Sequence, residues 1–147
     1  MKSATVLTID TNVLMYKSGG DHPLKAPCTR IISLIAEGKI EAMTTPEAIQ
    51  EFAHIYALRR GRRAAVQRAT EYAVLLAPRR LSEPEHLEAG LQLWVDNEQL
   101  GAFDAVLAAV ALDTKYATIV SANRAFASVP GLTHVFPDDD GVASLIG

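Results

Sequence analysis

Two apolar runs separated by three small polar residues open the chain. Residues 6–9 are apolar and mostly β-branched, which is typical of a strand buried on both faces. Asp10, Thr11 and Asn12 follow, and residues 13–16 resume the apolar pattern. We interpret this stretch as a strand, a turn and a short helix. Asp10 then lies at the carboxyl end of the strand, where open α/β sheets place their ligand sites.

Helices and strands alternate along the rest of the chain. The pattern predicts helices at residues 27–37, 46–60, 62–76, 83–96 and 104–112, a short helix from 124, and strands at 40–43, 117–120 and 133–136. Strands joined by helical crossovers are typical of a parallel sheet. No repeat or linker divides the sequence. We therefore expect one α/β domain over residues 1–147, with a central parallel sheet flanked by helices.

Two local patterns refine this prediction. Ser82, followed by Glu85 three residues later, forms a capping-box pattern that predicts the start of a helix. The expected buried residues of that helix are Leu87, Leu91, Leu93 and Trp94. Residues 137–141 include three adjacent aspartates, and we expect a solvated polar tail there.

Composition narrows the class of protein. The chain has 147 residues, of which 49% are hydrophobic and 21% charged, as in ordinary globular domains. No apolar run is long enough to span a membrane. Cys28 is the only cysteine, which excludes an internal disulfide and a cysteine-based zinc site. A cytosolic location is the expectation that follows.

Charge is distributed unevenly along the sequence. The net charge of −3 excludes a globally basic nucleic-acid binder. Residues 59–80, however, contain seven arginines and a single acid. This segment is either a solvated helical face or a basic flank that lies beside a polyanion.

Three acids stand on otherwise apolar elements: Asp10, Glu51 and Asp104. Each has a simpler explanation, since Asp10 and Asp104 could cap helices and Glu51 could be an exposed helix residue. Taken together they suggest a shared site, because converging carboxylates repel one another unless a cation lies between them. Hard oxygen ligands favour Mg²⁺ or Mn²⁺. The natural chemistry is hydrolysis of a phosphodiester by metal-activated water.

A phosphatase of the haloacid dehalogenase type also begins with a strand followed by an aspartate. That class requires a second aspartate two residues after the first, and this chain has Asn12 there. The sequence therefore disfavours a phosphatase.

Four segments together resemble a known family. They are residues 9–14 around Asp10, residues 46–52 with Glu51, residues 103–105 with the alanine-rich helix that follows, and residues 121–126. In this order they resemble the PIN-domain ribonucleases, specifically the VapC-type toxins of bacterial toxin–antitoxin pairs. The resemblance covers nearly the whole chain.

The resemblance implies a Mg²⁺-dependent endoribonuclease that forms a homodimer and is inhibited by a cognate antitoxin. By position, Asp10, Glu51 and Asp104 are the catalytic, metal-binding acids. Asn12 orients Asp10, and Ser121 is the small hydroxyl residue near the metal. Five arginines are candidates for holding the RNA backbone: Arg59, Arg60, Arg62, Arg63 and Arg124.

One position departs from the family pattern. The family usually has a fourth acid two residues after the hydroxyl, and this chain has Asn123. Asparagine offers a neutral oxygen but no charge, so we expect a second metal ion to bind more weakly. The alternative function is a catalytically weak or inactive module that binds RNA or an antitoxin without cleaving RNA.

Overall fold

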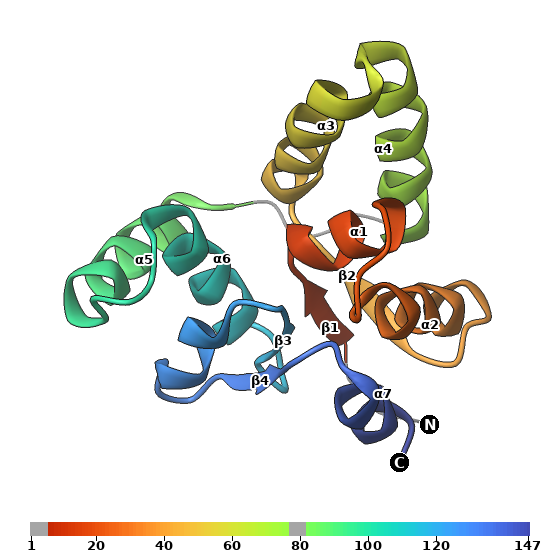
Figure 1. The fold of residues 1–147 in the computed structure, drawn as a ribbon. Coiled ribbons are helices and arrows are strands. Elements are labelled where there is room, and N and C mark those ends of the chain that lie inside the picture. The colour runs from red at the N-terminus through yellow and green to blue at the C-terminus, as the bar shows by residue number, and fades with distance from the viewer. Residues whose placement is uncertain (1–5, 77–81) are drawn as a thin grey trace.

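The central element is a parallel sheet of four strands in the order β2-β1-β3-β4 (Figure 1). The structure is a computed structural model that describes residues 6–76 and 82–147. The strands are β1 (Val6–Ile9), β2 (Glu41–Met43), β3 (Thr118–Val120) and β4 (Thr133–Val135). All four were predicted from the sequence, to within one residue at each end.

Helices flank the sheet on both faces, which confirms the predicted fold class. They are α1 (Thr11–Ser18), α2 (Lys25–Ala36), α3 (Pro46–Arg60), α4 (Arg62–Leu76), α5 (Pro84–Asp96), α6 (Ala102–Leu112), the 3₁₀ helix η1 (Arg124–Ser128) and α7 (Asp139–Ile146). The α3–α4 pair and the α5–α6 pair extend on different sides of the sheet (Figure 1).

The two faces of the sheet pack against different helices. Successive strand residues point to opposite faces. Leu7 and Ile9 of β1 belong to a core that includes buried residues of α1 to α4 and α7. Ile119 of β3 belongs to a second core with α6 and η1. Burial on both sides explains why β1 reads as a continuous apolar run.

The α3–α4 pair follows its sequence signals. Thr45 caps α3 through its side-chain oxygen, which accepts a hydrogen bond from the backbone N–H of Ala48. Pro46 stands at the first helical position, where a missing N–H costs nothing. Gly61 joins the two helices with a φ of 86°, a conformation that favours glycine. The predicted bounds of both helices are confirmed.

The predicted cap of α5 is wrong. The helix is capped by Glu83 together with His86, whose Nδ1 accepts the backbone N–H of Glu83 at 2.9 Å. Ser82 lies one residue too early, and its hydroxyl instead donates to Glu47. Histidine takes the place that a glutamate occupies in the usual capping box, so the sequence pattern did not indicate it.

The predicted buried face of α5 is also largely wrong. Leu93 is half-buried, but Leu87, Leu91 and Trp94 are 52%, 42% and 49% exposed. The helix packs on α6 through Gly90, where a Cβ atom would lie 2.6 Å from the Cα of Val106. This close approach leaves Leu87, Leu91 and Trp94 partly exposed, whereas Leu93 packs against the core that includes α6.

Three further boundaries differ from the prediction. Residues 137–141 are not a polar tail, because Asp138 caps α7 and accepts the N–H of Gly141 at 2.8 Å. Helix α6 begins at Ala102 with Gly101 as its cap, and α2 begins at Lys25. Among the described residues, no helix is long and apolar enough to cross a membrane.

Candidate functional site

The candidate site lies at the point where the order of strands in the sheet reverses. After β1 the chain adds β2 on one side, and it later adds β3 on the other side of β1. Ligand sites of open α/β sheets form at such a switch point, outside the carboxyl ends of the strands. Asp10 follows β1 and Ser121 follows β3. The N–H of Asp10 donates to the carbonyl of Val120 at 3.1 Å, which holds the two strand ends together.

Asp10 is buried, and both of its carboxylate oxygens are hydrogen-bonded. Oδ1 accepts the backbone N–H of Thr11 at 2.7 Å, so Asp10 also caps α1. Oδ2 accepts the hydroxyl of Ser121 at 2.7 Å and the amide of Asn12 at 3.2 Å. The two explanations given for Asp10 from the sequence are therefore compatible, because different oxygens serve the helix and the site.

Asn12 connects the ends of β1 and β3. Its Nδ2 donates to Asp10 and to the Ser121 hydroxyl oxygen, and its Oδ1 accepts the N–H of Ala122 at 3.0 Å. These contacts are those expected of a residue that orients Asp10.

Asp104 is half-buried in the first turn of α6 and meets Asn123. The Asn123 amide Nδ2 donates to Asp104 Oδ2 at 2.8 Å. The orientation of this amide is defined by the backbone, because Asn123 Oδ1 accepts the N–H of Ala125 at 3.1 Å. Asn123 therefore presents a donor to Asp104, while its oxygen caps η1. Asp104 does not cap α6, since Gly101 occupies that position.

Glu51 is exposed on α3 and reaches the site through Thr11. The Thr11 hydroxyl lies 2.9 Å from Glu51 Oε1 and 3.0 Å from the carbonyl oxygen of Ala48, and it can donate to either. Thr11 is not among the site residues that the sequence predicted. Its position directly after Asp10, facing α3, is what brings Glu51 to the first strand.

The electrostatics indicate that the three acids share one region. Burial raises the pKa of Asp10 from 3.8 to about 6, against the lowering effect of the Ser121 hydrogen bond, and the charges of Asp104 and Glu51 raise it further. Burial also raises the pKa of Asp104, which the Asn123 hydrogen bond opposes and the Glu51 charge supports. Negative charge therefore accumulates at the switch point.

No positive group of the described residues neutralises this charge. Asp10, Glu51 and Asp104 form no ion pair with any lysine, arginine or histidine of residues 6–76 and 82–147. Within the same ranges, no three Asp, Glu, His or Cys side chains are grouped so as to hold a metal ion. Among the described residues, Asp104 accepts a side-chain hydrogen bond from the neutral Asn123 amide.

The predicted RNA-binding arginines divide into two groups. Arg59, Arg60, Arg62 and Arg63 are exposed around Gly61, and helix geometry places Arg60 about 13 Å along α3 from Glu51. Arg124 directly follows Asn123, and its guanidinium lies 3.8 Å from the centre of the Phe136 ring. The backbone of Arg124 is thus one residue from Asn123, which donates to Asp104, whereas the other four arginines lie around the joint of α3 and α4.

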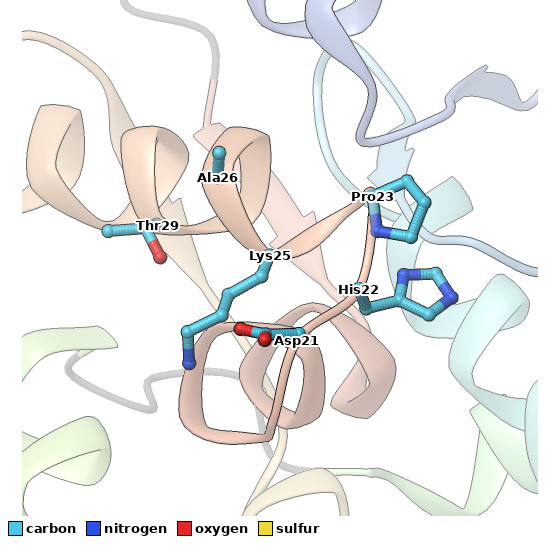
Figure 2. A pocket seen from close by; sticks show the side chains of 6 residues that line it. All are labelled: Asp21, His22, Pro23, Lys25, Ala26 and Thr29. Atoms are coloured by element: carbon cyan, nitrogen blue, oxygen red, sulfur yellow. The ribbon is translucent and has the colours of Figure 1, made fainter.

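A separate pocket lies at the start of α2 (Figure 2). It is lined by Asp21, His22, Pro23, Lys25, Ala26 and Thr29, and it includes none of the predicted site residues. The Lys25 amine donates to the carbonyls of Lys17 and Gly19 at the end of α1. This contact gives Lys25 a structural role.

The fold and the site define a parallel α/β domain whose carboxylates gather at the switch point between β1 and β3. The chain belongs to the PIN domain family, whose model matches residues 7–132. It is 42% identical over 146 residues to ribonuclease VapC7 of Mycobacterium tuberculosis, covering 97% of this chain and 99% of that protein. It is also 28% identical over 131 residues to ribonuclease VapC13 of the same species, covering 86% of this chain and 97% of that protein. The chain is thus a homologue of VapC ribonucleases, as its motifs indicated.

The raised pKa of Asp10 predicts how stability depends on pH without added metal. The folded state binds the proton more tightly than the unfolded state, so the stabilisation is fully present below pH 3.8 and is lost as the pH rises through about 6. A difference of about two pKa units corresponds to a loss of about 3 kcal/mol. Urea unfolding in EDTA between pH 4 and about pH 7 measures it.

Asp10→Asn is expected to remove most of this pH dependence, since its side chain does not titrate in this range. The matched control is Glu88→Gln, at an exposed position of α5, which should keep it. An Asp10→Asn variant that still loses stability as steeply as the wild type would show that Asp10 is not the titrating group.

Proposed function

We propose that this protein is a metal-dependent endoribonuclease and the toxin of a toxin–antitoxin pair. The observation that carries the proposal is the buried Asp10 carboxylate at the switch point. It lies close to the charges of Asp104 and Glu51, and no described cation neutralises it. A divalent cation would neutralise this excess of negatively charged oxygen ligands. The ribonuclease names of the relatives support RNA as the substrate.

The residues present fit Mg²⁺ or Mn²⁺. Asp10 and Asp104 supply the carboxylate oxygens, and Glu51 acts from the edge of the site. Mg²⁺ retains several water molecules and is commonly held by one or two carboxylates. A magnesium site therefore does not require three protein ligands that are already close together before the ion binds. When bound, the cation lowers the pKa of a water molecule and stabilises the negative charge that develops on the phosphate.

The chain itself supplies orientation and proton transfer. Ser121, Asn12 and the Thr11 N–H fix the orientation of the Asp10 carboxylate. One of the three acids accepts the proton of the attacking water. Arg124, which is held over Phe136, is well placed to bind an RNA phosphate. The arginines around Gly61 are proposed to attract RNA from a greater distance.

A second candidate is a module that binds RNA or an antitoxin without cleavage. It is favoured by Asn123, which replaces an acid and donates a hydrogen bond to Asp104. That contact occupies one oxygen of a proposed metal ligand. If metal binding is weak or absent, such a protein would bind RNA or an antitoxin but would not cleave RNA.

The proposal includes two protein partners and a cytosolic location. Exposed apolar side chains on α5, including Leu87, Leu91 and Val95, support contact with a second copy of the chain. Leu58, Val66 and Val74 are 78%, 63% and 76% exposed on the α3–α4 pair, and we assign the antitoxin to that pair.

The direct test is cleavage of a mixed pool of structured RNA by the purified protein with Mg²⁺, Mn²⁺ or EDTA. We expect discrete cuts that require metal and fall at least about 100-fold in Asp104→Asn, as for loss of a major catalytic group. Glu88→Gln should cut normally. RNA binding without any metal-dependent cutting would favour the non-catalytic module instead.

Replacement of the amide by a carboxylate tests the role of Asn123. In EDTA, Asn123→Asp should lower the thermal unfolding midpoint by a few degrees, because a donor to Asp104 becomes a like charge. With Mg²⁺ the same variant should bind the ion several-fold more tightly than the wild type, measured by calorimetric titration. Unchanged or weaker Mg²⁺ binding would show that residue 123 does not face the metal.

A further inference from the structure

An aromatic ring stands in water directly beside the acidic site. Phe103 is 89% exposed, whereas Phe52 and Phe126 are completely buried. Phe103 lies in the first turn of α6, immediately before Asp104. An exposed phenylalanine on a helix that otherwise buries most of its side chains contributes little to the core.

The ring is close to the position at which the substrate must bind. Adjacent Cα atoms are 3.8 Å apart, so the backbone of Phe103 is next to that of Asp104. Asp104 in turn contacts Asn123, which contacts the Ser121 hydroxyl beside Asp10. The backbone of Phe103 is therefore one residue from an acid at which an RNA phosphate would bind.

A second aromatic residue lies at the same end of the α5–α6 pair. His86 bonds to Asp113 at 2.9 Å at one end of the pair, and Gly90 faces Val106 in its middle. The two helices therefore run antiparallel, which places the last turn of α5 beside the first turn of α6. Trp94, the only tryptophan of the chain, stands in that turn and is 49% exposed.

We propose that Phe103 is a positioning residue that stacks on an unpaired base of the RNA next to the cleaved phosphate. The inference rests on the proposed function, because it requires RNA at the acidic site. Aromatic rings bind bases of any sequence through their π faces, and only an unpaired base offers its face. Phe103 would thus favour single-stranded or looped RNA without choosing its sequence.

A contact with a second copy of the chain is the competing use of this ring. Phe103 adjoins Asp104, so a partner seated on the ring would also cover the approach to the acid. The exposed leucines of α5 offer such a partner a surface that does not include Phe103. The position of Phe103 therefore favours the substrate over a second copy.

The test is binding of a fluorescein-labelled single-stranded RNA octamer of mixed sequence, followed by anisotropy. The protein carries Asp104→Asn and is kept in Mg²⁺, so that the probe stays intact. Phe103→Leu should weaken binding about ten-fold, the scale of losing one stacked base, whereas Phe103→Tyr should restore it. Ile146→Ala, an exposed apolar truncation on α7, is the matched control and should bind normally.

Two further readouts separate stacking from other roles. A duplex of the same sequence should bind Phe103→Leu and the parent protein equally, since its bases are paired. The fluorescence of Trp94 should change when the octamer binds the parent protein, because both aromatic residues stand at one end of the helix pair.

Several outcomes would overturn the inference. If Phe103→Leu binds the octamer as well as its parent while the wild type still cuts RNA, the nuclease stands and the stacking role fails. If Phe103→Tyr is as weak as Phe103→Leu, or if Phe103→Leu alters the oligomeric state in size-exclusion chromatography, the ring has another role. A wild type that neither cuts nor binds RNA would remove both proposals.

Discussion

The hydrogen bond from Ser121 to Asp10 is the contact on which the rest of the site depends. It links residues 111 positions apart, at the ends of neighbouring parallel strands, and it is buried. Strand β1 ends at Ile9 and β3 ends at Val120, so Asp10 and Ser121 are the first residues beyond the carboxyl ends of the two strands. The crossover connections thus place a carboxylate, a hydroxyl and the Asn12 amide within hydrogen-bonding distance. The same connections that define the fold therefore also position the site residues at this switch point.

Burying Asp10 has an electrostatic cost that the neighbouring acids increase. Its pKa rises to about 6 even though three groups donate hydrogen bonds to it, because burial and two nearby carboxylates outweigh them. The fold by itself gains nothing from this concentration of charge, whereas binding of a cation would relieve it. Asn123 reduces the charge by one acid and partly satisfies Asp104. The balance between this internal bond and a bound ion determines whether the site is catalytic.

Residue pattern predicted the sheet and most helices, because buried strands, caps and glycine turns leave local signals. It failed where the outcome depends on packing between elements. The Leu87, Leu91 and Trp94 stripe is typical of a buried helix face, but the Gly90–Val106 contact turns α5 so that the stripe faces solvent. The position of Asn123 in the sequence suggested that its side-chain oxygen is a neutral metal ligand. In the structure that oxygen accepts the backbone N–H of Ala125, so the amide nitrogen points toward Asp104. The hydroxyl bridge from Thr11 to Glu51 joins elements 40 residues apart, so no local pattern could reveal it.

The central claim is that Asp10 and Asp104 hold a divalent cation at the switch point. The most direct measurement is a crystal structure of the protein with Mn²⁺, in which anomalous scattering locates the ion. We expect Mn²⁺ bonded to carboxylate oxygens of both Asp10 and Asp104, with the Asn123 amide moved away from Asp104. Mn²⁺ absent from these carboxylates at saturating concentration, with the Asn123–Asp104 hydrogen bond intact, would contradict it.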